Sequence, residues 1–214
     1  MSIFPLRSSL VLLLGVANCQ SAELITNGAF DFGFTGFSTD YTFISAGTST
    51  SPGTFGIRTS SRDFNPGYDL FSDHTSGTGQ MMLIDGVPNA TIWAETVTVL
   101  PNTDYTFSAW ATTANGANLP TLRFLINSSQ VGSDLPLVIP AGTWQNFVNV
   151  WNSGSNTTAT IAIVDTASTA FGNDLALDDL SFTGPVPEPS SALLAMLGGA
   201  GIFLRRRRPS GSDI

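Results

Sequence analysis

Short runs that alternate apolar and polar residues are the feature that most limits the folds open to this chain. In residues 104–112, Tyr105, Phe107, Ala109 and Ala111 fall on one side of an extended chain, and Trp110 falls on the other. Successive side chains of a strand point to opposite faces, so such a run suits a strand with one buried face. We therefore predict a strand here, with Trp110 on the face opposite Phe107.

Further strands are predicted where the same alternation recurs between turn-forming clusters such as "SPG", "PNT" and "NSGSN". No amphipathic helix of useful length lies between Glu23 and Gly184. About nine short strands favour an all-β fold, a two-sheet antiparallel sandwich. Besides 104–112, the predicted strands are 41–46, 81–84, 92–99, 121–127, 144–151, 158–165 and 174–182.

Charge restricts the classes of partner. The sixteen Asp and Glu residues include Glu188 and Asp213, so fourteen lie between Glu23 and Gly184, and against three arginines they leave a net charge of −11. Such a surface repels phosphate backbones, which excludes nucleic acid as a favoured partner. Divalent cations and neutral sugars stay open, as does the alternative that acidity serves solubility alone.

The N-terminus is typical of a secretory signal. Arg7 gives a positive start, residues 10–17 form an apolar stretch too short to span a bilayer, and small residues precede Glu23. We predict a signal peptide over 1–22, cleaved after Ala22. Lipidation at Cys19 is the alternative.

The C-terminus carries a second hydrophobic segment. Residues 192–204 are 13 uncharged residues, and as a helix they would cover about 20 Å of a hydrocarbon layer about 30 Å thick. The cluster Arg205, Arg206, Arg207 and Arg208 would stay cytoplasmic. We predict a short transmembrane helix that tethers the exported body.

The order of Val186, Pro187, Glu188 and Pro189, then the apolar run, then the arginine cluster, resembles the PEP-CTERM sorting signal of exported bacterial proteins. The resemblance implies that residues 185–210 are cut at the Pro-Glu-Pro box by exosortase, a membrane-embedded transpeptidase, and that the protein passes to the cell envelope or extracellular matrix. The prolines favour an extended box, which suits a protease groove. A plain membrane anchor is the alternative.

Residues 23–184 resemble the galactose-binding-like jelly rolls that include many carbohydrate-binding modules. The resemblance rests on "LITNGAFDFGFTGF", "ETVTVLPNTDYTFSAWA", "GTWQNFVNVW" and "NDLALDDLSF", in that order. It implies a jelly-roll domain whose first and last segments lie close together. A Gly-rich loop in "DHTSGTGQMMLIDG" should precede a core strand through Met82 and Ile84.

The same resemblance implies a structural Ca²⁺ ion beside the termini. Its ligands would be Asp31, either Asp178 or Asp179, and a backbone oxygen near Asn27. Calcium takes six to eight oxygen ligands, which an acidic body can supply. The alternative is that these acids only accept hydrogen bonds in turns.

Sugar binding needs aromatic rings for stacking and polar groups for the hydroxyls. Trp93 and Trp110 are the best candidates, and Tyr41, Phe43 and Arg58 come second. The alternative is that the tryptophans other than Trp110 fill the sandwich.

No catalytic residues are predicted. His74 is the only histidine and lies in a polar loop, no Gly-x-Ser-x-Gly motif occurs, and adjacent Asp178 and Asp179 should point to opposite faces of a strand. We predict a non-enzymatic exported protein that associates with glycan or exopolysaccharide. A purely structural surface or biofilm component and a glycan hydrolase are the alternatives.

Overall fold

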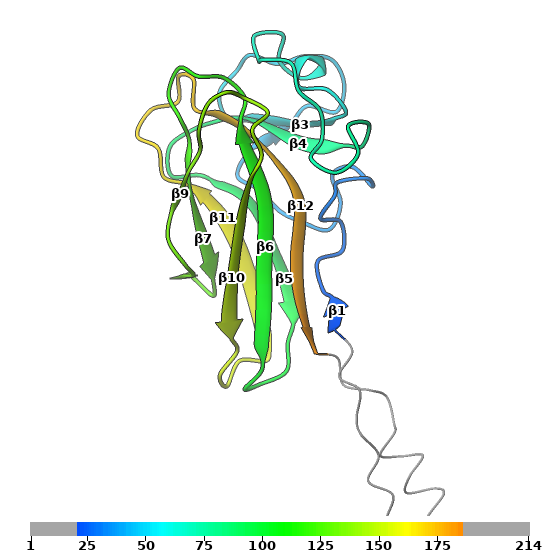
Figure 1. Ribbon diagram of the computed structural model, residues 1–214, viewed down its shortest axis with the longest axis vertical. Coiled ribbons are helices and arrows are strands. Elements are labelled where there is room, and N and C mark those ends of the chain that lie inside the picture. Colours follow the sequence, from blue (N-terminus) through cyan, green and yellow to red (C-terminus); the bar gives the residue numbers. More distant parts are fainter. Residues whose placement is uncertain (1–20, 186–214) are drawn as a thin grey trace, which may run out of the picture. The chain divides into compact units, whose positions relative to one another are not determined.

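The computed structural model describes residues 21–185, which form a sandwich of two facing β-sheets (Figure 1). Residues 1–20 of the predicted signal peptide 1–22, the apolar run 192–204, the Pro-Glu-Pro box and the arginine cluster lie outside the described residues. Between residues 21 and 185 we find no helix that is long and apolar enough to cross a membrane.

The described chain contains short strands and one 3-10 helix, η1 (Ser61–Asp63). The strands are β1 (Ser21–Glu23), β2 (Thr42–Phe43), β3 (Thr54–Arg58), β4 (Met81–Asp85), β5 (Thr91–Thr98), β6 (Asp104–Thr113), β7 (Thr121–Ile126), β8 (Ser129–Gln130), β9 (Leu135–Pro136), β10 (Gln145–Asn152), β11 (Thr158–Asp165) and β12 (Asp174–Pro185).

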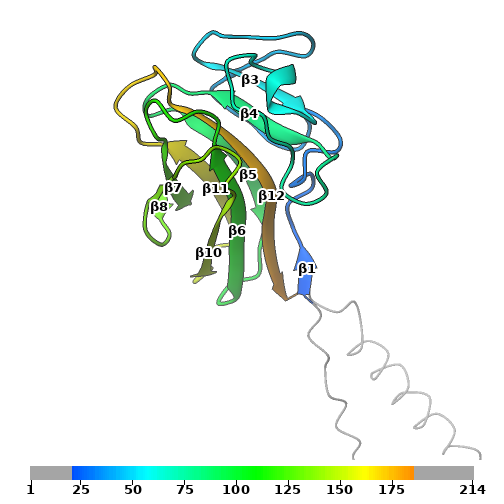
Figure 2. The same cartoon turned by 45° about the horizontal axis from the view of Figure 1, so that its top comes forward.

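One sheet has the order β10-β6-β12-β4-β3-β2, with β1 paired to β12 as its seventh strand. The other has the order β5-β11-β7-β8, with β9 paired to β7 as its fifth. The pairs are antiparallel except for β2 with β3. Figures 1 and 2 show β6, β10 and β12 running beside one another in the first sheet, with β5, β7 and β11 behind them. The predicted all-β antiparallel sandwich is confirmed.

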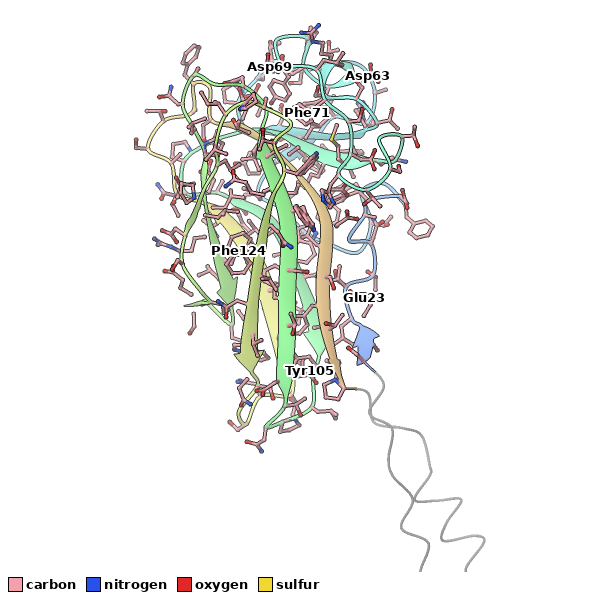
Figure 3. All side chains as sticks on the ribbon, in the orientation of Figure 1. Glu23, Asp63, Asp69, Phe71, Tyr105 and Phe124 are labelled. Atoms are coloured by element: carbon pink, nitrogen blue, oxygen red, sulfur yellow. The ribbon has the colours of Figure 1, made fainter. Side chains whose placement is uncertain are left out.

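The inner faces of the sheets supply the main core, as the alternation predicted. Tyr105, Phe107, Ala109 and Ala111 of β6 are buried, and so are the apolar residues of β7. Phe124 of β7 stacks on Phe147 of β10 with ring centroids 3.6 Å apart, which joins the two sheets. Figure 3 labels Phe124 and Tyr105 among the side chains of this sandwich.

A second, smaller core lies on the outer face of the seven-stranded sheet, which is the face turned away from the five-stranded sheet. The segment 61–71 lays Phe64, Tyr68 and Phe71 over Met81 and Leu83 of β4. Because both faces of β4 are thus covered, all five of its residues are buried. Met82 and Ile84 lie in the main core, as predicted.

Strand β3 was not predicted from the sequence. Its residues Thr54, Phe55, Gly56 and Ile57 are all buried, so no polar residue alternates with the apolar ones. Conversely, the predicted strand 41–46 is reduced to the two residues of β2. The other predicted strands occur within a residue or two of their expected bounds, apart from the last, which continues to Pro185.

Strand β12 changes partner along one edge, and this change creates the candidate site. Residues 174–177 pair with β4, the register then shifts between Asp178 and Ser181, and residues 183–185 pair with β1. The segment that follows β1 packs against this register shift: Gly28 O accepts a hydrogen bond from Leu180 N at 3.1 Å. A Cβ on Gly28 would lie 1.8 Å from Leu180 O, so only glycine fits this approach.

Candidate functional site

A cavity of about 190 Å³ opens where the β12 irregularity leaves room between β1 and β4. The opening segment of the domain, the Gly-rich loop 73–80 and β12 all contribute to its wall. The lining residues are Ala29, Asp31, Asp73, Thr75, Ser76, Gly79, Gln80, Asp178 and Asp179. Segments about 150 residues apart in sequence therefore meet here, as the resemblance to jelly rolls implied.

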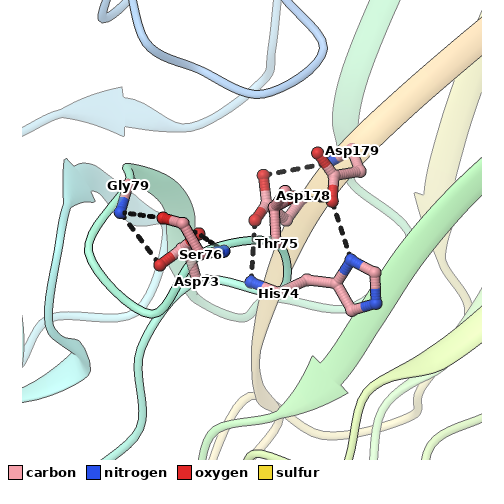
Figure 4. Close-up of polar contacts among 7 residues, drawn as sticks. All are labelled: Asp73, His74, Thr75, Ser76, Gly79, Asp178 and Asp179. Atoms are coloured by element: carbon pink, nitrogen blue, oxygen red, sulfur yellow. Dashed lines mark hydrogen bonds and ion pairs between the residues drawn. The ribbon is translucent and has the colours of Figure 1, made fainter.

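Asp178 is the buried acid of this cavity (Figure 4). Its Oδ2 accepts the backbone N–H of His74 and its Oδ1 accepts that of Asp179, both at 2.9 Å. Burial raises the pKa of Asp178 to about 7, and repulsion from Asp179 and Asp73 adds to this rise. The hydrogen bond from the His74 N–H opposes the rise, because it stabilises the ionised carboxylate. The carboxyl therefore changes charge near neutral pH.

Asp179 lines the same cavity, and this corrects the prediction that the two acids point to opposite faces. Its φ is +47°, so the chain is not extended at this residue. Its Oδ2 lies 2.7 Å from His74 Nδ1 and accepts the hydroxyl of Thr75. The irregular backbone of β12 thus brings both carboxyl groups to the loop 73–80.

Asp73 organises that loop. Its carboxylate accepts the N–H and hydroxyl of Ser76 at 2.8 and 3.0 Å and the N–H of Gly79 at 2.9 Å. Burial opposes ionisation, but these donors prevail and hold the pKa of Asp73 below its usual value. Asp73 is therefore an ionised group that stabilises the turn.

An aromatic cluster borders the cavity on the outer face of the seven-stranded sheet. The His74 ring stacks on Trp110 with centroids 3.8 Å apart and planes at 18°, and Trp144 meets His74 edge-on at 5.8 Å. Trp110 and Trp144 are half-buried, so part of each ring reaches solvent. The Trp110 side chain lies on the face of the sheet opposite that of Phe107, as the alternation in β6 predicted.

The sheet continues below this cluster as a polar face. Ser108 of β6 is in register with Val148 of β10 and Ser181 of β12, and Thr106 is in register with Val150 and Thr183. Val148 and Val150 are exposed. Across the strands next to Trp110, small apolar side chains on β10 therefore lie beside hydroxyl groups on β6 and β12.

The predicted calcium ligands assemble only in part. Asp31, Asp178 and Asp179 line one cavity, but Asn27 does not: its carbonyl accepts the N–H of Phe30, and its side chain bonds within residues 27–35. In residues 21–185, no three or more His, Cys, Asp or Glu side chains are grouped to hold a metal ion. The set does not form a finished ligand shell, and calcium stays a prediction.

The structure corrects several predicted sugar contacts. Trp93 is only 1% exposed and lies opposite Ile163 in the main core, and Tyr41 is buried with its hydroxyl donating to Val87 O at 3.3 Å. Neither ring has a face open to a ligand. Arg58 donates to the carbonyls of Ile57, Ile44 and Gly47, which engages its guanidinium in holding a loop. Phe43 packs half-buried against the core.

Of the predicted sugar contacts, Trp110 is half-buried on the outer face of the sheet, where His74 stacks on its ring. The sequence did not predict that Trp144 belongs to a surface cluster or that His74 stacks on Trp110. The position of Trp110 followed from strand alternation. Its contact with His74 depends on a loop that folds back from a distant part of the chain, which no local pattern reveals.

Comparison with protein families identifies the tail. Residues 185–208 match the PEP-CTERM protein-sorting motif. This motif marks a protein that is exported, anchored transiently at the membrane and processed by exosortase. A comparison with curated proteins found no match.

Solved structures resemble the sandwich. The Stig cyclase Fisc from Fischerella sp. TAU has a TM-score of 0.55 at 12% identity, over 78% of this chain and 100% of that one. The CBM22-1 xylan-binding domain of Xyn10C from Paenibacillus barcinonensis has a TM-score of 0.53 at 12% identity, over 80% and 99%. At this identity the likeness shows the fold. The chain is thus an exported protein with a PEP-CTERM sorting motif at residues 185–208, behind a jelly-roll domain similar to carbohydrate-binding modules.

Proposed function

We propose that the jelly-roll domain is a non-catalytic module that binds neutral polysaccharide on the outer face of the seven-stranded sheet. The observation that carries the proposal is the His74–Trp110–Trp144 cluster at the border of a hydroxyl-lined face. The sorting motif supports delivery of this module to the cell envelope or extracellular matrix, where such polymers occur.

The aromatic cluster supplies what sugar stacking requires. Sugar rings have apolar faces that pack on aromatic side chains, and fixed polar groups then select the hydroxyls. His74 holds the Trp110 ring in place through stacking, and Asp179 holds His74 at Nδ1. The ring is therefore oriented before a ligand arrives, which lowers the entropy cost of binding.

The neighbouring face suits an extended polymer. Thr106 and Ser108 of β6 provide hydroxyls that donate and accept hydrogen bonds, and Val148 and Val150 of β10 provide apolar contact beside them. The acidic body disfavours acidic polymers, because like charges repel. A neutral polysaccharide lying across the strands is the ligand that best matches this surface.

The test is affinity electrophoresis of the full chain through gels that contain xylan, galactan, mannan or β-glucan. We expect at least one polymer to retard the protein and Trp110→Ala to weaken that retardation at least ten-fold, with an unchanged melting temperature. Phe32→Ala is the matched control, since Phe32 is a highly exposed aromatic outside the cluster.

Three results would contradict the proposal. Retardation that is unchanged in Trp110→Ala would show that the cluster is not part of the binding site. Turnover of a polymer would show that the protein is a hydrolase. Failure to bind any polymer would favour a purely structural component of the surface or biofilm.

We also propose that Ca²⁺ binds beside the cluster, with Asp31 and either Asp178 or Asp179 as ligands. Their convergence on one cavity together with Asp73 supports this proposal, because a divalent cation would relieve the repulsion among four acids. The hydrogen bonds that Asp178 and Asp179 accept from the loop 73–80 leave fewer free oxygens, so Asp31 is the ligand on which the proposal depends.

A further inference from the structure

Strand β10 forms a free edge of the seven-stranded sheet. It pairs with β6 alone, and Figure 1 shows it on the side of β6 that is turned away from β12. In the described part of the chain, residues 146–152 form no backbone–backbone hydrogen bond except with β6. The N–H and C=O groups on the outer side of this strand can therefore pair with another strand.

The other long edge strand, β5, is protected against such pairing. Ser38 forms an antiparallel bridge with Ala94 of β5, the N–H of Asp40 donates to Thr91 O at 3.0 Å, and the strand carries the charged Glu95. Strands β1, β2, β8 and β9 have only two or three residues each. Short, charged or covered edges resist association, whereas β10 has eight residues, none of them charged.

The sequence of β10 is suited to pairing with itself. Residues 146–152 read Asn-Phe-Val-Asn-Val-Trp-Asn, which is the same in both directions apart from the exchange of two aromatic residues. If two copies pair antiparallel about Asn149, Val148 of each copy lies opposite Val150 of the other. The remaining opposite pairs are Phe147 with Trp151 and Asn146 with Asn152. Every residue thus meets one of its own kind, and like apolar pairs across strands stabilise an antiparallel sheet.

The alternation along β10 assigns these pairs to consistent faces. Val148 and Val150 are 60% and 58% exposed on the outer face, whereas Phe147 is buried and Trp151 half-buried on the inner face. Directly opposite residues of an antiparallel pair point to the same face of the sheet. Two copies would therefore join four exposed valines into one apolar patch outside, and the aromatic pairs would meet inside.

Charge also favours this strand as the contact between copies. The body has a net charge of −11, so two copies repel each other at most approaches. Along β10 and the adjacent β6, Asp104 is the one charged residue, and its Oδ1 accepts a hydrogen bond from the Asn152 side chain at 2.6 Å. A contact along β10 thus keeps most of the acidic residues out of the interface.

We propose that the protein forms a two-fold symmetric dimer in which β10 pairs antiparallel with β10 of a second copy, with Asn149 on the axis. The two seven-stranded sheets then form one continuous sheet with both aromatic clusters on the same face, since the same patch is used twice. One strand from each copy makes a small interface, so the dimer depends on concentration. Anchoring at a membrane, which the sorting motif marks, raises the local concentration that such a contact needs.

The test is sedimentation velocity of the full chain over a range of concentrations, without polysaccharide. We expect the wild type to form dimers. Val148→Lys and Val150→Glu should each raise the dimer dissociation constant at least ten-fold, because each change brings two like charges close to the axis. Both side chains are exposed, so the fold should tolerate the changes.

A double variant and a matched control make the test specific. Val148→Lys combined with Val150→Glu should restore the dimer, because opposite charges then face each other twice across the axis. Asn89→Asp is the matched control for Val150→Glu, since it adds the same charge in the exposed loop between β4 and β5 and should leave the dimer unchanged.

Disulfide cross-linking tests the register. In a Cys19→Ser background, Asn149→Cys should give a covalent dimer with an added oxidant, because residue 149 faces itself within the Cα separation that a disulfide spans. Asn152→Cys is the control, since Asn152 is more exposed than Asn149 but faces residue 146 of the second copy.

Several outcomes would overturn the inference. They are a monomer at every concentration, a dimer that neither single charge variant weakens, a double variant that stays monomeric, and equal cross-linking at residues 149 and 152. The proposed function is tested separately, because polymer retardation that depends on Trp110 can persist in a monomer.

Discussion

Replacing Asp174 by asparagine is expected to stabilise the domain at alkaline pH. Asp174 is buried opposite Asp85, and burial raises its pKa from 3.8 to about 7. Because the folded state holds the proton more tightly than the unfolded state, ionisation costs stability as pH rises from about 4 to about 7. The penalty is absent below this window and complete above it.

The magnitude follows from the pKa difference. A rise from 3.8 to about 7 corresponds to about 4 kcal/mol of unfolding free energy lost above pH 7. Part of this penalty belongs to the pair, since Asp85 is also raised, and asparagine does not reproduce every hydrogen bond of the carboxyl. We therefore expect Asp174→Asn to be more stable than wild type by about 2 kcal/mol at pH 8 and to differ little at pH 4.

Urea denaturation of the full chain at pH 4, 6 and 8 measures this effect. Asp63→Asn is the matched control, because it removes the same charge from an exposed residue and reports any effect of net charge alone. The reasoning is refuted if Asp174→Asn is no more stable than Asp63→Asn at pH 8. It is also refuted if the wild type loses no stability between pH 4 and pH 8.

Three further predictions address the tail, the calcium proposal and the glycine contact. Glu188→Ala should leave the full-length chain in the membrane fraction, whereas intact-mass measurement of the wild type should show loss of the residues after the Pro-Glu-Pro box; an uncut wild type in the matrix would contradict this. Calcium at 100 times its dissociation constant should raise the unfolding free energy by about 2.7 kcal/mol, and Asp31→Asn should abolish the gain; a melting temperature insensitive to both EDTA and Ca²⁺ would count against the site. Gly28→Ala should destabilise the domain by about 3 kcal/mol in urea denaturation, because its Cβ would meet Leu180 O, and an unchanged midpoint would show that the two segments can separate freely.

Local alternation explains why much of the sandwich could be predicted. In β7, β11 and most of β6, one face is buried and the other is not, so apolar and polar residues alternate along the sequence. Strand β3 carries no such pattern, because β4 and the segment 61–71 bury it from several sides. A residue pattern reports burial, and it reveals a strand only where the two faces differ.

The tryptophans show the same limit at the level of function. Trp93 and Trp110 both lie in predicted strands, yet Trp93 faces Ile163 in the core and Trp110 faces outward beneath His74. Alternation on β6 was enough to place Trp110, because four apolar partners marked the buried side. Both Ile92 and Trp93 of β5 are buried, so alternation could not decide the position of Trp93.

The amino-acid sequence alone was enough to identify the sorting motif at residues 185–208 and a series of strands with one apolar face. These properties depend on residues next to one another in the chain. Only the tertiary structure decided the sites, because His74 meets Asp178 across 104 residues and Asp85 meets Asp174 through sheet register. Such contacts depend on how distant segments of the chain pair. The irregular backbone at Asp179, with a φ of +47°, likewise occurs where β12 changes partner from β4 to β1.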